Sequence, residues 1–86
     1  MLKVILAPGH SPGSICFYCE EQRFIIGGDV LFRESIGRTD LPLGDHQTLL
    51  NSIRKELFVL PDDVEVYPGH GPSTTIGYEK MHNPFL

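Results

Sequence analysis

The stretch Ala7-Pro8-Gly9-His10-Ser11-Pro12-Gly13-Ser14 ends an apolar run and presents a histidine, and two later stretches follow the same arrangement. The apolar run Val4-Ile5-Leu6 leads into it and predicts a strand, which the proline ends by removing a backbone donor. The glycine after the proline lets the backbone turn and approach its neighbours closely. The sequence therefore predicts a strand whose end carries His10 in a site loop.

Two later stretches repeat this arrangement of an apolar run, a glycine and a polar side chain. Phe24-Ile25-Ile26-Gly27-Gly28 ends at Asp29, and Val64-Glu65-Val66-Tyr67-Pro68-Gly69 ends at His70. Each of these residues alone is typical of an ordinary turn. Imidazole nitrogen and carboxylate oxygen are also the ligands that zinc accepts. The threefold repetition therefore indicates one metal centre built from His10, Asp29 and His70.

Length and composition limit the class of protein. The chain has 86 residues, which fit one unit over residues 1–86, and 41% hydrophobic and 21% charged residues are ordinary for a globular domain. A net charge of −4 without a basic run argues against nucleic acid and anionic membranes as partners. No apolar stretch approaches the roughly 18 residues that cross a bilayer, and the first apolar segment is too short for a signal peptide. We therefore expect a soluble, cytoplasmic protein.

The apolar pattern predicts an α/β (α+β) fold with about four strands, one long helix and one short helix. The expected strands are residues 3–7, 14–19, 24–27 and 64–67, and the second and third pair as a hairpin. Asp45 is a good N-cap for a helix through about Phe58, whose apolar residues share one face that must lie on the sheet. Residues 73–75 are expected to cap the short helix over residues 76–82.

The segment between Asp29 and Asp45 is expected to be mostly irregular. Residues 30–32 continue apolar and predict the start of a short helical turn. Residues 33–44 contain two glycines and a proline and predict a long loop, long enough to suggest a function.

Cys16 and Cys19 have a Cys-x-x-Cys spacing, which suggests a redox or zinc site. Their neighbours favour a strand, where residues three apart point to opposite faces. We therefore expect one buried sulfur and one near the turn, both structural.

Gly9-His10-Ser11-Pro12-Gly13 also fits the G-x-S-x-G pattern of serine hydrolases, and Ser11, Asp29 and His70 follow the chain order of that triad. The nucleophile of that pattern sits between a strand and a helix. Here β-prone residues follow, so the serine hydrolase is the weakest of the hypotheses.

Five stretches together resemble a known family. They are residues 8–14 (PGHSPGS), 28–32 (GDVLF), 35–42 (SIGRTDLP), 67–77 (YPGHGPSTTIG) and 83–85 (NPF). They resemble the metallo-β-lactamase-fold hydrolases, especially the branch close to glyoxalase II (hydroxyacylglutathione hydrolase). The resemblance covers nearly the whole chain, with the motifs in the right order.

The resemblance implies a metal-dependent hydrolase with a two-metal site. It makes His10 a ligand of one metal, His70 a ligand of the other, and Asp29 the catalytic residue that bridges them. In such enzymes a metal-bound hydroxide attacks a thioester or ester carbonyl, because zinc lowers the pKa of bound water to about 7. Iron is an alternative metal.

The family's His-x-His-x-Asp-His motif is absent from this sequence. The remaining histidines, His46 and His82, are expected to be exposed helix residues. Catalytic zinc takes about three protein ligands and a water, so neither metal site would be complete. The resemblance therefore implies that residues 1–86 form the C-terminal half of an αββα sandwich, with both helices on one face, inactive alone. Its open sheet face would bind the missing N-terminal half or a second copy.

Two features bear on the small-molecule substrate. Ser14 stands where glyoxalase II commonly has a second histidine, which suits a related branch. Gly37-Arg38-Thr39-Asp40 is similar to a segment of the persulfide dioxygenases of this fold, which use one iron. Arg38 either binds an anionic substrate group or pairs with Asp40 or Asp45. The family's glutathione-binding helical extension has no counterpart in these residues.

The hypotheses thus stand in order. The leading one is a zinc-dependent hydrolase of the glyoxalase II type, of which this chain supplies part of the site. The second is a non-catalytic folded half-domain, or a weak metal-binding and association module. The persulfide dioxygenase-like iron enzyme and the Ser11 hydrolase follow.

Overall fold

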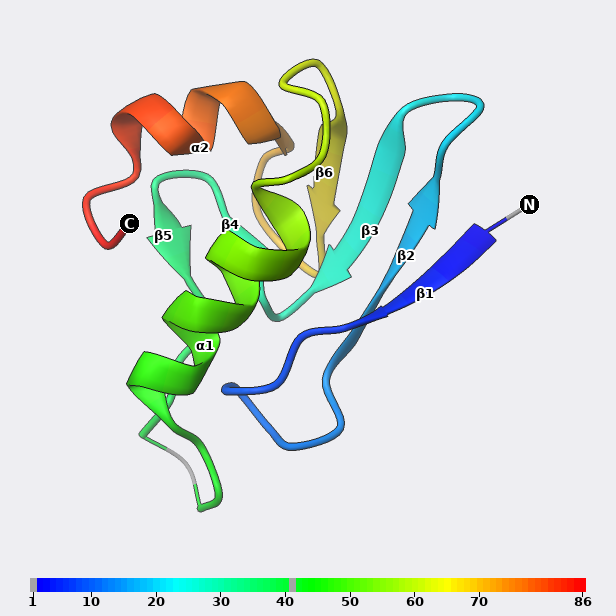
Figure 1. Ribbon diagram of the computed structural model, residues 1–86. Coiled ribbons are helices and arrows are strands. Elements are labelled where there is room, and N and C mark those ends of the chain that lie inside the picture. The colour runs from blue at the N-terminus through cyan, green and yellow to red at the C-terminus, as the bar shows by residue number, and fades with distance from the viewer. Residues whose placement is uncertain (1, 41) are drawn as a thin grey trace.

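The computed structural model describes residues 2–40 and 42–86, so Leu41 of the motif at residues 35–42 lies outside the described residues. A five-stranded sheet runs in the order β1-β2-β3-β6-β7, next to a two-stranded sheet, β4-β5 (Figure 1). The strands of the larger sheet are β1 (Leu2–Leu6), β2 (Ile15–Cys19), β3 (Phe24–Gly28), β6 (Glu65–Pro68) and β7 (Thr74–Thr75).

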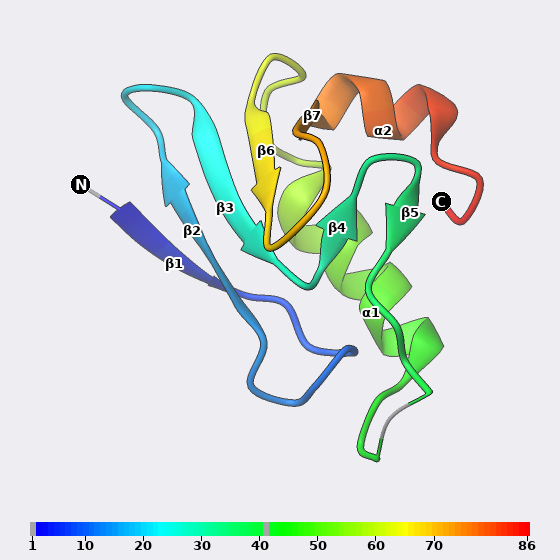
Figure 2. The ribbon, with the colours of Figure 1, turned by 180° about the vertical axis from the view of Figure 1, so that it is seen from behind.

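The four predicted strands and the hairpin between the second and third are confirmed. β1, β2 and β3 pair antiparallel in sequence, and β3 pairs in parallel with β6. The parallel pair needs a long crossover, and the helical segment between the two strands supplies it. The sequence did not predict β7, a two-residue strand that pairs with β6 and leads into the last helix (Figure 2).

The prediction of a helical turn at residues 30–32 is wrong. β4 (Leu31–Phe32) and β5 (Ser35–Ile36) pair antiparallel instead, and β5 occupies part of the segment expected to be irregular. The turn between them places Glu34 at φ 58°, a left-handed conformation that non-glycine residues adopt rarely. A hydrogen bond from its backbone to a buried glutamate, described below, holds this turn, and local sequence gives no sign of it.

The predicted long helix is confirmed through Leu57. It consists of α1 (His46–Ser52), directly continued by the π-helical segment η1 (Ile53–Leu57). The Asp45 carboxylate caps α1 by accepting a hydrogen bond from the Thr48 amide at 2.8 Å, which lowers the pKa of Asp45. The predicted short helix is α2 (Ile76–His82), capped by the Thr75 hydroxyl, which accepts from the Tyr78 amide. His46 and His82 are exposed, as predicted.

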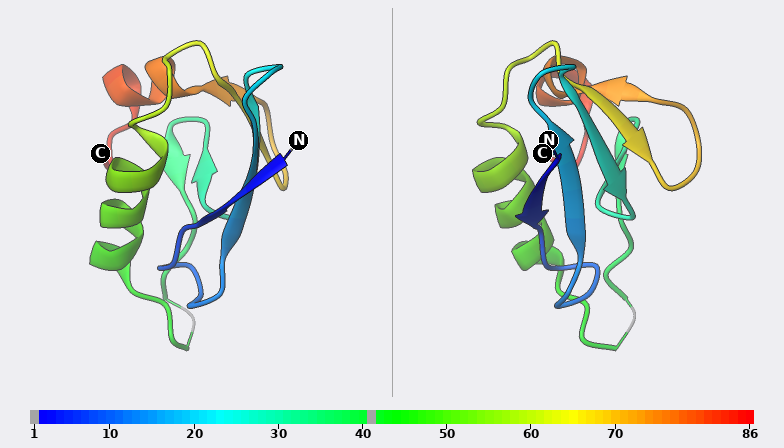
Figure 3. Two further views of the ribbon diagram at one scale, coloured as in Figure 1. Left: turned by 45° about the vertical axis from the view of Figure 1, so that its right-hand side comes forward. Right: turned by 90° about the vertical axis from the view of Figure 1, so that its right-hand side faces the viewer.

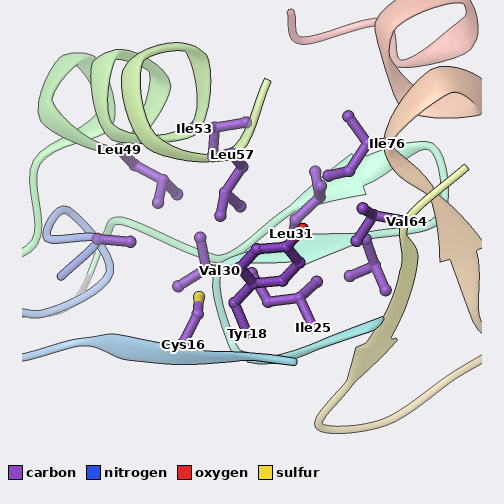
Figure 4. Packing of buried hydrophobic residues seen from close by; sticks show 12 residues of the cluster. Cys16, Tyr18, Ile25, Val30, Leu31, Leu49, Ile53, Leu57, Val64 and Ile76 are labelled. Carbon is purple, nitrogen blue, oxygen red and sulfur yellow. The ribbon is translucent and has the colours of Figure 1, made fainter. Parts of the chain in front are cut away.

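The core lies between the α1–η1 segment and one face of the sheet (Figure 4). Leu49, Ile53 and Leu57 point from the helical segment toward the strands, and Ile76 of α2 extends this layer. Fully buried aliphatic side chains of this size each contribute about 1.5–3 kcal/mol relative to exposure. The strand residues of the core are Cys16, Tyr18, Ile25, Leu31 and Val66, joined by Ala7, Val30 and Val64 from the adjoining loops.

Both cysteines are free and structural. Cys16 is fully buried, and this burial raises the pKa of its thiol to about 11. Cys19, the last residue of β2, points to the opposite face, as predicted, but it is also buried. The raised pKa keeps the Cys16 thiol protonated and makes it a poor nucleophile and a poor metal ligand.

The other face of the sheet exposes apolar side chains. The strand register aligns Val4 with Phe17, Phe17 with Ile26, and Ile26 with Tyr67, which gives one row across four strands. Val4 is 63% exposed and its neighbour Leu6 is 57% exposed. α1 covers one side of β1 and β2, and no helix of the described residues covers the other (Figure 3). Within the described residues, no helix is long and apolar enough to cross a membrane.

We expect the open face to cause self-association, because an apolar row of this kind is removed from water when two copies meet. Val4→Glu combined with Ile26→Glu is expected to give a monomer of 9.6 kDa in sedimentation equilibrium, whereas the unmodified chain shows a concentration-dependent higher mass. Val59→Glu is the matched control, since Val59 is exposed but lies outside the sheet. An unmodified chain that stays monomeric at every concentration would contradict the expectation.

Candidate metal centre

The His10 loop is held by the N-cap residue and by the last residue of α1. The Asp45 amide donates to the Gly9 carbonyl at 2.7 Å, and the buried Ser52 hydroxyl lies 2.8 Å from the Pro8 carbonyl. Gly9 has φ 133°, and a Cβ there would lie 2.4 Å from backbone atoms of Leu49. Only glycine allows this contact, which explains the Pro-Gly-His order at the end of β1.

The His10 ring is oriented by a backbone carbonyl. Its Nδ1 lies 2.8 Å from the carbonyl oxygen of Arg38, which can only accept a hydrogen bond. Nδ1 therefore carries the proton, and the lone pair of Nε2 is free. Nε2 lies 3.8 Å from the Asp29 carboxylate. A histidine that donates from one nitrogen to a carbonyl while the other faces a carboxylate has the arrangement of a typical metal ligand.

Asp29 sits at a junction of three segments. Gly28 before it has φ 53° and accepts a hydrogen bond from the Gly69 amide at 2.8 Å. On the other side, the Gly37 amide donates to the Val30 carbonyl at 3.0 Å. A Cβ at Gly37 would lie only 1.8 Å from the Asp29 carbonyl oxygen. The close passage of Gly37 therefore fixes where the Asp29 carboxylate emerges.

His70 faces the same cavity from the loop after β6. Its exposed ring stacks on Phe32, with 4.7 Å between the ring centres and 28° between the planes. The cavity has a volume of about 500 Å³. It is lined by His10, Asp29, Phe32, Arg33, Ser35, Ile36, Gly37, Arg38, His70, Gly71 and Pro72. The three predicted ligands thus line one cavity, although strands far apart in the sequence carry them.

The three side chains do not form a complete ligand set. Among the described residues, no group of three or more His, Cys, Asp or Glu side chains lies close enough to hold a metal ion. The structure brings His10 and Asp29 together, whereas His70 lines the same cavity without completing a group of three with them. The donor types fit zinc or iron, but the number of converging donors falls short of the three that a catalytic site needs.

Arg38 contributes its backbone to the site and its side chain to an ion pair. Its Nε and one terminal nitrogen donate to the two Asp40 oxygens at 2.8 and 3.1 Å, so the predicted pairing with Asp40 is present. This pair raises the pKa of Arg38 and lowers the pKa of Asp40. Both side chains are exposed, so the pair contributes little to stability. Asp45 is occupied in capping α1 instead.

The serine hydrolase geometry is absent from the described residues. The Ser11 hydroxyl lies 2.8 Å from the Ser14 hydroxyl, and Asp29 faces His10 rather than His70. The strand β2 follows the motif, where a nucleophile elbow requires a helix.

Sequence reasoning missed three contributions to the site. These are the Arg38 carbonyl that orients His10, the Phe32 ring beneath His70, and the Arg33 side chain at the cavity wall. A backbone carbonyl carries no sequence signal. Gly37 was a usable signal, because a glycine beside a polar motif indicates a close backbone approach.

We expect Gly37→Ala to disturb the site, because its Cβ cannot fit beside the Asp29 carbonyl. The backbone shift should lower the free energy of unfolding by about 1–3 kcal/mol and move the NMR signals of His10 and Asp29. Gly13→Ala is the matched control, since a Cβ there meets nothing within 4 Å. Its change should stay within about 0.5 kcal/mol in urea denaturation. Equal effects of the two substitutions would contradict the described packing.

Comparison with known proteins agrees with this geometry. Residues 1–70 match the Metallo-beta-lactamase superfamily. The chain is 54% identical over 83 residues to a probable metallo-hydrolase of Streptococcus pyogenes, covering 96% of this chain and 36% of that protein. It is 51% identical over 84 residues to the hydroxyacylglutathione hydrolase GloC of Haemophilus influenzae, covering 98% of this chain and 40% of that protein.

Solved structures show the same fold. The BLEG-1 B3 metallo-beta-lactamase superposes with a TM-score of 0.96 at 53% identity, covering 99% of this chain and 41% of that one. The structure of TTHA1623 in a di-iron-bound form superposes with a TM-score of 0.95 at 48% identity. The match covers 99% of this chain and 42% of that one. The chain thus spans about two fifths of the length of the relatives it matches. By sequence and by fold, it belongs to the metallo-beta-lactamase superfamily.

Proposed function

We propose that this chain supplies part of the active site of a metal-dependent hydrolase that cleaves a thioester or ester of the hydroxyacylglutathione type. The observation that carries the proposal is the His10–Asp29 pair, with Nδ1 of His10 tied to a carbonyl and Nε2 turned toward the carboxylate. The likeness to a relative named hydroxyacylglutathione hydrolase supports this substrate class.

In this proposal His10 and His70 would each hold one metal ion, and the catalytic carboxylate of Asp29 would be shared between the two ions. The carbonyl of Arg38 keeps the His10 tautomer that leaves Nε2 available for a metal. A bound metal supplies an acidified water and a polarised carbonyl, the chemistry that thioester hydrolysis needs. We favour zinc because of the imidazole and carboxylate donors, and the di-iron form of TTHA1623 supports iron as the alternative.

The proposal assigns Arg38 to the substrate as well. Arg38 is among the residues that line the cavity, and the Asp40 carboxylate orients its guanidinium through two hydrogen bonds. A guanidinium held in this way can still offer its remaining donors to an anionic group of a small-molecule substrate. Both cysteines are free, which suits a reducing, cytoplasmic setting.

We propose further that the chain corresponds to the C-terminal half of the fold and is inactive alone. Two observations support this: the relatives are more than twice as long, and one sheet face exposes a continuous apolar row. The partner that completes the ligand set would lie on that face. The same row favours the second candidate function, a folded half-domain that acts as an association module.

A chimera tests the hydrolase proposal. This chain replaces the segment of the Haemophilus influenzae GloC that it matches, and hydrolysis of a hydroxyacylglutathione thioester is measured with and without EDTA. We expect EDTA-sensitive hydrolysis by the chimera and none by the 86-residue chain.

Variants of the chimera assign the roles. Asp29→Asn should abolish activity, because the substitution removes the bridging charge, and Asp63→Asn is the control, since Asp63 pairs with Arg23 outside the cavity. A folded chimera that binds metal but leaves thioesters intact would overturn the substrate class. EDTA-resistant hydrolysis would overturn the metal mechanism.

A further inference from the structure

Arg33 lies at the corner of the β4–β5 turn and lines the cavity beside Phe32 and His70. Its side chain is about half exposed, at 48%. The proposed metal chemistry gives this cation no role, and neither does the hydrophobic core. A charged group at the wall of a cavity is a candidate for substrate recognition.

Tyr78 and Glu34 hold the Arg33 guanidinium in place. The guanidinium carbon lies 5.2 Å from the centre of the Tyr78 ring, a cation–π contact. The Tyr78 hydroxyl donates to the Glu34 carboxylate at 2.9 Å, and that carboxylate lies 4.0 Å from Nε of Arg33. Within residues 2–40 and 42–86, no hydrogen bond uses the two terminal nitrogens of Arg33. One face of the guanidinium is therefore covered by the Tyr78 ring and Nε lies near a carboxylate, while the two terminal nitrogens keep their donors for a ligand.

The turn that carries Arg33 is fixed from below by a buried carboxylate. Glu79 is fully buried and accepts from the Glu34 amide at 2.9 Å, from the Asn83 side chain at 2.8 Å and from the Thr74 hydroxyl. The Asn83 side chain also donates to the Ser35 carbonyl at 3.0 Å. Glu79 of α2 and Asn83 directly after it therefore anchor the turn at Glu34 and at Ser35. Because the turn is fixed before any ligand binds, the entropic cost of binding at Arg33 is lower.

The other arginine of the cavity, Arg38, has fewer donors left for a ligand. Two nitrogens of Arg38 already donate to Asp40, whereas the nearest carboxylate to Arg33 is 4.0 Å from Nε alone. A guanidinium with a free terminal edge matches a carboxylate in a two-point hydrogen-bonded pair. Arg33 is therefore the better-placed cation for an anionic ligand.

We infer that Arg33 binds a carboxylate of the substrate and makes the site select thioesters that carry one over neutral thioesters. This inference rests on the proposed function, because only that function makes the bound carboxylate part of a substrate. The binding itself requires neither a metal nor hydrolysis, so it is tested separately.

The test is an NMR titration of the metal-free 86-residue chain with N-acetyl-S-methylcysteine, a thioether with one carboxylate. Its methyl ester is the neutral probe, and inorganic phosphate is the second anion. We expect saturable shifts at Phe32 and His70 with the carboxylate and none with the ester. Arg33→Gln should weaken binding about tenfold, because it removes the positive charge. Arg33→Lys should weaken binding less, because lysine keeps the charge but lacks the paired donors of the guanidinium.

Arg54→Gln is the matched control, because Arg54 is an exposed arginine on η1 that does not line the cavity. It should leave the affinity unchanged. Equal affinity of Arg33→Gln and the unmodified chain would overturn the inference, as would equal binding of the ester or the absence of saturable shifts. If inorganic phosphate binds more tightly than N-acetyl-S-methylcysteine and also depends on Arg33, the carboxylate assignment is wrong and the ligand group is a phosphate. An inactive chimera would leave each of these results unaffected.

Discussion

The approach of Gly37 to Asp29 is the contact on which the site depends. It joins the end of β3 to the end of β5, and the residue after Gly37 offers its carbonyl to His10. This single close approach of the backbone therefore fixes both the position of the Asp29 carboxylate and the tautomer of His10. Any side chain at residue 37 would separate them, so the chemistry of the site rests on the absence of a single Cβ.

The core and the site share the same one-sided architecture. The α1–η1 segment buries one sheet face and anchors the His10 loop, while the opposite face remains apolar and open. The cavity likewise brings His10 and Asp29 together, and His70 does not complete a group of three donors with them. The open sheet face and the incomplete set of donors are both consistent with a chain that spans about two fifths of the length of its relatives. The proposed missing half accounts for the open face and the unfilled ligand positions at once.

Sequence reasoning succeeded where the signal is local. Alternating and helical apolar patterns located four strands and both helices, and Pro-Gly before histidine marked the strand ends. It failed where distant residues decide the structure. Residues 31–36 form a hairpin whose turn is held by Glu79 and Asn83, more than 40 positions away. Likewise, β7 exists because β6 pairs with it, and the carbonyl that orients His10 has no side-chain signature.

We propose that this chain carries only part of a metal centre, with His10 and Asp29 close together and His70 outside that pair. A zinc titration followed by NMR at His10, Asp29 and His70 would decide this. We expect weak binding in which the His10 and Asp29 signals move together and the His70 signal responds independently. Stoichiometric, tight binding that shifts all three signals along one curve would contradict it, because the chain alone would then hold a complete site.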